Sequence, residues 1–311
     1  MKSHQEEFLK IFSTIDFRNI IDHPNILIAA RFWEKERYCA AEICYKFMRM
    51  IDDMIDNHKA KNILIKETEK ESFLKNVNQW LQKTVVSEEC NPEHNKLIDT
   101  IKKFVIPLWP LEYFAKSMIY DINNDSFPTF ESFFDYSMGA SVAPASVFVH
   151  LCGIRKTGNG YAEPSFDVKK AATPCAIFSY LVHIIRDFQK DQLNNLNYFA
   201  DDLIAENNLT RKDLRNIALG SQPTDNFRNL ISAYFNHADH YRLKTMDTIK
   251  EIKHLMEPRY QLSLEIIFSL YLMVFERINI RNGRFTSAEL NPTPEETAGR
   301  VYETILNFSA E

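Results

Sequence analysis

Four aspartates in two spaced pairs are the side chains of this sequence best suited to chemistry. The first pair is Asp52 and Asp56, and the second pair is Asp187 and Asp191. Residues four apart in a helix lie one turn apart on the same face, so the carboxylates of each pair would stand close together. Neighbouring carboxylates repel each other, and a divalent cation between them removes that repulsion. Because carboxylates that leave room for water and phosphate oxygens are typical Mg²⁺ ligands, the spacing predicts Mg²⁺ at both pairs.

The first pair lies in a mostly apolar stretch. Arg49 precedes Asp52 by one turn, and Tyr45 precedes Arg49 by another. Asp53 follows Asp52 directly and is a further candidate metal ligand. A solvent-exposed acidic helix face is the simpler alternative, because such spacing also arises by chance. Five apolar residues surround these acids: Met48, Met50, Ile51, Met54 and Ile55. They favour instead a buried helix whose carboxylates line a cavity.

The second pair lies at the end of a very apolar helical pattern. His183 is one turn before Asp187 on the same face, and Tyr180 lies a further turn before it. The simpler alternative is a helix end that turns polar as it leaves the core, where Arg186 and a lysine complement the helix dipole. Two aspartates near a helix C-terminus oppose that dipole, so they need a compensating cation. A metal ion or a basic partner would supply one.

If the two helices face each other, four carboxylates converge on one pocket. Such a cluster can hold two or three Mg²⁺ ions around a diphosphate group. The metal ions would neutralise negative charge on a leaving diphosphate and so promote C–O ionisation to an allylic cation. An apolar, aromatic cavity would shield that cation from water. The 23 phenylalanines and 13 tyrosines of the chain can build such a lining, although most of them belong to the ordinary core.

The elements that must position these acids are helices. Only seven of the 311 residues are glycine, about a third of average usage. Chains rich in strands or phosphate-binding loops use more glycine. Apolar residues recur at helical spacing over residues 27–57 (as one or two helices), 62–84, 94–120, 173–191, 226–255 and 258–280. We therefore expect an all-α chain, with one domain over residues 1–311.

Prolines, glycines and a threonine predict where several helices begin and end. Pro107 and Pro110 should kink or break the pattern at 94–120. Thr129 is a candidate helix cap. Residues 153–167 hold three of the seven glycines and should form a loop. The helix after this loop should start near Pro174, with proline in the tolerated first turn.

Composition excludes several classes of protein. A net charge of −5 and a pI near 6.0 do not suggest a nucleic-acid binder. Five cysteines without a CxxC pair fit buried free thiols, such as Cys39 and Cys44, in a reduced cytoplasm, and do not fit a zinc site. The N-terminus is polar and does not resemble a signal peptide. The apolar stretches 171–185 and 262–275 are too short to span a membrane and predict core helices.

The motifs of this chain resemble those of the squalene/phytoene synthase family. The family's first motif corresponds to residues 45–56, from Tyr45 through Arg49 and Asp52-Asp53 to Asp56. Its second motif corresponds to residues 183–191, followed by Tyr198-Phe199. Residues 134–142, which include Tyr136 and Gly139, match a helix that lies between the two motifs, and Tyr271 takes the place of a family tyrosine. The agreement extends over about residues 25–285.

The resemblance implies a class I isoprenoid synthase fold, in which helices of one domain surround a central cavity. It also implies Mg²⁺ and two prenyl diphosphates that are joined through a cyclopropyl diphosphate. Two groups of residues would then bind the Mg²⁺–diphosphate groups: Asp52 with Asp56, and Asp187 with Asp191. Arg49 and Arg186 would hold the phosphates. Four tyrosines would surround the reacting carbons: Tyr45, Tyr136, Tyr198 and Tyr271.

His183 is the most informative departure from the family pattern, which has asparagine there. Tyr180 replaces a glutamine, Met138 replaces a tyrosine, and residues 143–145 replace paired glycines. An imidazole is a weak Mg²⁺ ligand, so we expect His183 to be a hydrogen-bond or cationic partner of a diphosphate oxygen or of Asp187. Surrounding acids and phosphate would then raise its pKa, so activity should fall as pH rises through that pKa. The alternative is a core histidine that bonds to a backbone carbonyl.

Three functions fit these patterns. The leading hypothesis is a head-to-head prenyltransferase that uses a C15 or C20 isoprenyl diphosphate and needs NADPH only if the product is squalene. The second is a class I terpene cyclase that acts on one prenyl diphosphate. The third is a non-catalytic assembly factor, which the retention of four buried acids disfavours because unused buried charge is destabilising. We expect no nucleic-acid partner and no transmembrane segment, although peripheral membrane contact would suit release of an apolar product. The pattern gives no indication of oligomeric state.

Overall fold

The computed structural model describes residues 2–19, 24–62, 64–84, 92–158 and 160–310, and these are mostly helical. In chain order the α-helices are α1 (Lys2–Phe12), α2 (Pro24–Ala30), α3 (Lys35–Asn62), α4 (Glu67–Gln82), α5 (Pro92–Lys103), α6 (Trp109–Asn123), α7 (Phe130–Ser137), α8 (Ala143–Gly153), α9 (Val168–Leu193), α10 (Asp201–Glu206), α11 (Arg211–Ala218), α12 (Asp225–Ile252), α13 (Pro258–Arg277), α14 (Ser287–Leu290) and α15 (Pro294–Asn307). A π-helix, η1 (Met138–Val142), joins α7 to α8, and a short 3₁₀ helix, η2 (Lys253–Leu255), follows α12. The all-α prediction is confirmed.

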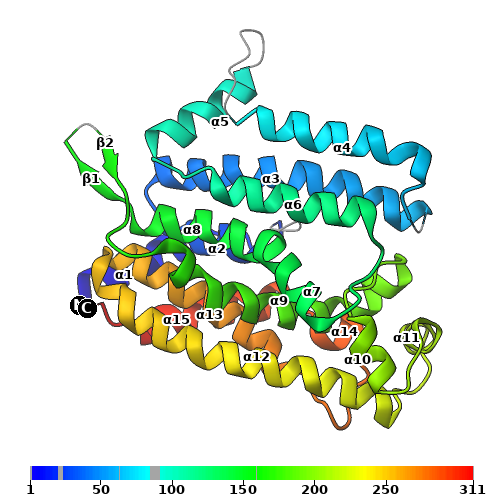
Figure 1. Cartoon of the computed structure of the whole chain (residues 1–311). Helices are drawn as coiled ribbons and strands as arrows, with labels where there is room; N and C mark the ends of the chain where they lie inside the picture. The colour runs from blue at the N-terminus through cyan, green and yellow to red at the C-terminus, as the bar shows by residue number, and fades with distance from the viewer. Residues whose placement is uncertain (1, 20–23, 63, 85–91, 159, 311) are drawn as a thin grey trace.

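The helices form two layers that α8 joins (Figure 1). Helices α3, α4 and α6 pack against one another in the first layer, and α9, α12 and α13 do so in the second. Helix α8 contacts α3 and α6 on one side and α9 and α13 on the other. The two ends of the chain lie together, because α1 packs on α15 and the ring centroids of Phe8 and Phe308 are 5.8 Å apart. The helix that carries the first acid pair therefore lies in one layer, and the helix that carries the second pair lies in the other.

Two clusters of buried apolar side chains hold these layers in place. The first cluster draws on α2, α3, α4, α6 and α8, and the second draws mainly on α7, α9 and α12. On α3 the buried apolar residues recur at helical spacing: Ala40, Ala41, Cys44, Met48, Ile51 and Ile55. On α9 they are nearly continuous from Ala176 to Phe188. Burial of each large apolar side chain contributes about 1.5–3 kcal/mol, so these helices anchor the acids firmly.

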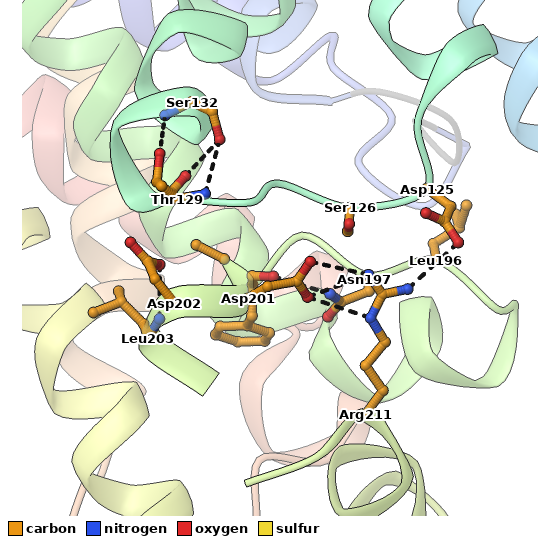
Figure 2. Close-up of polar contacts among 12 residues, drawn as sticks. Asp125, Ser126, Thr129, Ser132, Leu196, Asn197, Asp201, Asp202, Leu203 and Arg211 are labelled. Carbon is orange, nitrogen blue, oxygen red and sulfur yellow. Dashed lines mark hydrogen bonds and ion pairs between the residues drawn. The ribbon is translucent and has the colours of Figure 1, made fainter. Parts of the chain in front are cut away.

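Several predicted boundaries are confirmed. The pattern at 27–57 forms two helices, α2 and α3, and the chain breaks between α5 and α6 at the predicted prolines. Thr129 caps α7, since its hydroxyl accepts a hydrogen bond from the backbone N–H of Ser132, and Figure 2 shows this capping pair. The chain also contains helices that were not predicted, namely α1, α10, α11, α14 and α15.

Two local predictions are wrong. Helix α9 begins at Val168, where Asp167 caps it by accepting a hydrogen bond from the backbone N–H of Lys170. Pro174 therefore lies within the second turn and not the first, and the helix tolerates the loss of one backbone bond near its start. The expected loop at 153–167 contains a hairpin of β1 (Arg155–Thr157) and β2 (Gly160–Ala162), because short antiparallel pairing satisfies backbone groups that a loop would leave open.

The π-helix η1 is a close crossing point between α6 and the α7–α8 segment. A β-carbon on Gly139 would lie 2.1 Å from the backbone oxygen of Tyr113, so only glycine allows this approach. Ala140 and Ser141 of η1 reach the central cavity, and the Ser141 hydroxyl donates to the backbone oxygen of Ala176 at 2.9 Å. Single-turn π-helices are often found beside functional sites.

The described cysteines and helices also bear on the compartment and membrane predictions. Cys39, Cys44, Cys152 and Cys175 are free thiols, and Cys90 lies outside the described residues. Among the helices of the described chain, none is both long enough and apolar enough to cross a bilayer.

Candidate active site

A cavity of about 810 Å³ lies between the two layers, within the usual range of ligand pockets. Residues from both apolar clusters contribute to its walls, including Ile28 and Met48 from one cluster and Ile184 and Val274 from the other. Much of the remaining wall is apolar as well, with Phe114, Phe148, Val149, Ile249, Ile252, Leu264 and Leu270 among its residues. The central cavity that the family resemblance implied is therefore present.

All of the predicted site residues except Asp53 line this cavity. They are Tyr45, Arg49, Asp52, Asp56, Tyr136, His183, Arg186, Asp187, Asp191, Tyr198 and Tyr271. The Asp53 side chain is 49% exposed and pairs with Arg49. Asp53 is therefore a partner of Arg49 in this structure, and its role as a metal ligand stays a prediction. Asn25 and Ile26 of α2 also line the cavity.

The first acid pair carries more negative charge than its neighbours neutralise. Arg49 pairs with Asp52 through one guanidinium nitrogen and with Asp53 through another. Burial raises the pKa of Asp52 to about 7, and repulsion from Asp56 adds to the shift. Burial likewise raises the pKa of Asp56 to about 7, with a contribution from Asp121. A divalent cation here would relieve the repulsion and favour the ionised carboxylates.

Asp121 of α6 is a third acid beside this pair, and sequence reasoning missed it. Its Oδ2 accepts a hydrogen bond of 2.7 Å from the Tyr136 hydroxyl. The Lys59 ammonium is 3.8 Å from its Oδ1 and donates to the backbone oxygen of Asn124 at 2.8 Å. Burial raises the pKa of Asp121 to about 6, although Lys59 and Tyr136 oppose the shift. The available signal was a lone aspartate in the apolar pattern of α6, between Met118 and Ile122.

The second acid pair is arranged differently. Arg186 donates to both oxygens of Asp187, from Nε to Oδ1 at 2.7 Å and from Nη2 to Oδ2 at 2.9 Å. Nε2 of His183 lies 2.6 Å from the same Oδ2. Burial alone would raise the pKa of Asp187, but His183 and Arg186 outweigh it and hold that pKa well below its usual range. Burial and the neighbouring Asp187 and Asp56 instead raise the pKa of Asp191 well above its usual range.

His183 bonds to Asp187, one of the two partners expected for it, and not to a backbone carbonyl. Burial and the nearby Arg186 guanidinium lower the pKa of His183, and Asp187 does not compensate fully. Among the protein groups alone, burial and Arg186 outweigh Asp187, so the raised pKa expected from surrounding acids is not found; the effect of a phosphate on this pKa stays a prediction. Nε2 of His183 also lies 2.8 Å from Nη2 of Arg186, so one ring nitrogen contacts both Arg186 and Asp187.

The tyrosines form the aromatic part of the wall. The ring centroids of Tyr136 and Tyr180 are 6.4 Å apart, and those of Phe127 and Tyr198 are 6.5 Å apart. Burial raises the pKa of Tyr45, Tyr136, Tyr180, Tyr198 and Tyr271. These side chains therefore keep their protons and present neutral hydroxyls and aromatic faces to the cavity.

Polar contacts fix the loop that carries Tyr198. Arg211 bridges two segments, with Nη1 3.5 Å from Asp125 and Nη2 3.2 Å from Asp201, as Figure 2 shows. Asp202 accepts a hydrogen bond of 3.0 Å from the backbone N–H of Phe130. The loop before α10 is thus tied to the segment between α6 and α7. A narrow pocket next to the main cavity, which includes Asp56, Asp121 and Tyr198, lies against these segments.

The donor set fits Mg²⁺ only together with a ligand. No three histidine, cysteine or acidic side chains in the described part of the chain are placed to hold a metal ion by themselves. Mg²⁺ in proteins commonly keeps waters and binds through one or two carboxylates together with substrate phosphates. The under-neutralised Asp52, Asp56 and Asp191 fit that pattern.

Comparisons with known proteins identify the family of this chain. A family model described as squalene/phytoene synthase matches residues 24–296. Chloroplastic phytoene synthases from Narcissus pseudonarcissus and an Oncidium hybrid cultivar are each 23% identical over 203 residues, or 65% of this chain. The chain spans less than half of these relatives, 45% and 46% of their lengths.

Two crystal structures share the fold. One is a dehydrosqualene synthase in complex with ligand, with a TM-score of 0.68 and 13% identity, covering 97% of this chain and 96% of its own. The other is squalene synthase HpnC from Alicyclobacillus acidocaldarius, with a TM-score of 0.62 and 16% identity, covering 85% of this chain and 90% of its own. The isoprenoid synthase fold is therefore confirmed. Because the family model matches most of the sequence, the chain belongs to the squalene/phytoene synthase family.

Proposed function

We propose that this protein is a Mg²⁺-dependent prenyltransferase that joins two isoprenyl diphosphates head to head and releases diphosphate. The observation that carries the proposal is the convergence of both acid pairs, with Arg49 and Arg186, on one cavity. The rest of the wall is largely apolar, which suits a substrate with an anionic head and a hydrocarbon tail. Membership of the squalene/phytoene synthase family supports the same class of reaction.

The charged end of the cavity would bind the diphosphate groups. Asp52, Asp56 and Asp191 would hold Mg²⁺, which when bound neutralises charge on the leaving diphosphate. Arg49 and Arg186 would donate charge-assisted hydrogen bonds to phosphate oxygens. These groups stand on two helices anchored in the core, so little reorganisation is needed when charge develops on the leaving group.

The aromatic and apolar walls would protect the carbocation. Neutral tyrosines offer no anionic oxygen to trap it, and their ring faces attract cations. The aliphatic side chains around them exclude water, which would otherwise quench the reaction. Tyr136 is held in one orientation by its hydrogen bond to Asp121, so its ring has a fixed place beside the reacting carbons.

One observation favours a second candidate, a class I terpene cyclase that uses a single prenyl diphosphate. Asp187 is already bonded to Arg186 and His183, which leaves fewer free carboxylates at the second pair than at the first. A single diphosphate would need only the first pair and Asp191.

Product identification separates these functions. Pure protein would be incubated with Mg²⁺ and a C15 or C20 prenyl diphosphate, with and without NADPH, and the lipids identified by mass spectrometry. We expect a C30 or C40 hydrocarbon, with an effect of NADPH only if squalene is formed. A cyclised C15 or C20 product would replace this proposal by the cyclase. Absence of any product from either substrate would favour the assembly factor.

A further inference from the structure

The central cavity is open at the acids and closed at its other end. At the acid end its wall includes the exposed Lys190, next to Asp191. The lining side chains of the other end are all apolar and at most 8% exposed: Phe148, Val149, Ala171, Ala172, Ile252 and Leu264. A hydrocarbon chain that enters at the acids therefore meets a floor of buried side chains, not solvent.

The arrangement of α8 and α9 shows that this floor lies far from the acids. The hairpin of β1 and β2 joins the end of α8 to the start of α9, and these helices pack along each other, so they run antiparallel (Figure 1). The Ser141 hydroxyl donates to the backbone oxygen of Ala176, and the same register brings Phe148 to the start of α9, close to Ala172. Ala172 precedes Asp187 by 15 residues of one helix, about 22 Å at 1.5 Å per residue.

The Phe148 ring is the largest side chain of the floor, and it cannot move aside. Its centroid is 4.9 Å from that of Trp33, which lies behind it and is not among the residues that line the cavity. Trp33 is fixed in turn, because its Nε1 donates to the Ser263 hydroxyl at 2.7 Å and its ring centroid is 5.8 Å from that of Tyr260. The Ser263 hydroxyl donates to the backbone oxygen of Ala29 at 2.7 Å. Because such an interior is close-packed, a longer chain gains no room by displacing the ring.

The depth of the cavity can be compared with the length of a prenyl chain. Magnesium–oxygen distances of about 2 Å on each side of a metal ion place phosphate oxygens about 4 Å from the acids, which leaves about 18 Å for the chain. Each isoprenyl unit adds four carbon–carbon bonds of about 1.5 Å and extends the chain by roughly 5 Å, so C15 reaches about 15 Å and C20 about 20 Å. A C15 chain therefore fits between the acids and Phe148, and an extended C20 chain does not.

We propose that Phe148, backed by Trp33, determines chain length, and that the enzyme uses a C15 isoprenyl diphosphate and forms a C30 product. This rests on the proposed function, because it names the substrate of the same site. Phe148 contacts the end of the chain and takes no part in diphosphate release. Trp33 is a positioning residue, since it acts only by holding the Phe148 ring in place.

Binding of unreactive analogues tests this inference without turnover. In these analogues sulfur replaces the oxygen between chain and diphosphate, and their affinity is measured by calorimetry with Mg²⁺. Wild-type protein should bind the C15 analogue roughly tenfold more tightly than the C20 analogue. Phe148→Ala removes a six-carbon ring, which makes room for one five-carbon isoprenyl unit, so this variant should bind the C20 analogue at least as tightly as the C15 analogue. Equal affinities in wild-type protein, or an unchanged ratio in Phe148→Ala, would overturn the inference.

A second pair of variants keeps the inference testable if Phe148→Ala does not fold. Phe148→Leu should reduce the preference for the C15 analogue by roughly threefold. Phe114 lines the side wall seven residues before Asp121, about 10 Å along α6, so Phe114→Leu makes the same change in size away from the floor. The ratio of affinities should stay at the wild-type value in Phe114→Leu, and an equal change in both variants would overturn the assignment to Phe148. Wild-type protein that binds neither analogue would instead contradict the proposed function itself, so the two failures are distinguishable.

Discussion

Helices α3 and α9 carry aspartates with the same spacing, yet the two pairs differ in charge balance. On α3, burial and neighbouring carboxylates raise the pKa values of Asp52 and Asp56 to about 7, and Arg49, which is shared with Asp53, does not offset the rise. On α9, Arg186 donates hydrogen bonds to both oxygens of the adjacent Asp187. These bonds and the nearby His183 lower the pKa of Asp187. The placement of the arginine next to or one turn before an aspartate therefore separates an acid that is paired through both oxygens, Asp187, from one that is paired through a single oxygen, Asp52.

The largest expected effect on activity should follow from removal of one acid of the first pair. Asp52→Asn should reduce Mg²⁺-dependent diphosphate release by about 10³-fold, because it removes a metal ligand and so weakens the stabilisation of charge on the leaving group. Melting temperature should not fall, since one of several repelling acids is removed. Asp53→Asn is the matched control, because Asp53 is not among the residues that line the cavity, and this variant should keep most of its activity. Equal loss in both variants would contradict the distinction between these two acids.

A smaller effect on activity should follow from loss of the hydrogen bond between Tyr136 and Asp121. Asp121→Asn should lower kcat by roughly 10- to 100-fold, since a neutral amide holds the tyrosine hydroxyl less strongly and leaves Lys59 without its counterion. Tyr136→Phe should behave similarly. If the two residues act through one contact, the double variant will be no worse than the worse single variant. Fully additive losses would show that they act independently.

The first pair and Asp187 should also respond differently to pH. Asp52 and Asp56 have pKa values of about 7 in the folded chain, against about 4 in an unfolded chain. Between these values the folded state binds more protons, so the stability of the metal-free protein should fall as pH rises from 5 to 8. Asp187, whose pKa is lowered, stays ionised throughout this window and contributes no change. Thermal melts should show the fall, and Mg²⁺ with pyrophosphate should remove it; a rise in metal-free stability over this range would contradict the charge assignment.

The smallest effect is expected at His183. His183→Asn keeps a donor for Asp187 and should retain activity, whereas His183→Leu should lose about tenfold or less, the value of one hydrogen bond to a charged group. Because the imidazole is already neutral, no fall in activity between pH 6 and pH 8 should depend on it. Rate–pH profiles of the three proteins test this. A fully active His183→Leu enzyme would show that the contact has no role.

Features set by neighbours along the chain were predictable, and features set by distant contacts were not. The spacing of Asp52 and Asp56 on an apolar helix was enough to place them at a cavity. The contact of Asp121 with Tyr136 joins two helices and has no signature in either segment alone. Likewise, the pKa of His183 depends on its burial and on its contacts with Arg186 and Asp187. The family resemblance predicted the acids of the site but not their charge state. The extent of a single domain stays a prediction.

The number of diphosphates released for each molecule of product tests the central claim most directly. Purified enzyme, Mg²⁺ and the accepted prenyl diphosphate would be allowed to react, and inorganic pyrophosphate and hydrocarbon would be quantified in the same sample. Two acid-bearing helices that face one cavity predict two pyrophosphates for each hydrocarbon of twice the substrate's carbon number. One pyrophosphate for each product of unchanged carbon number would contradict head-to-head joining.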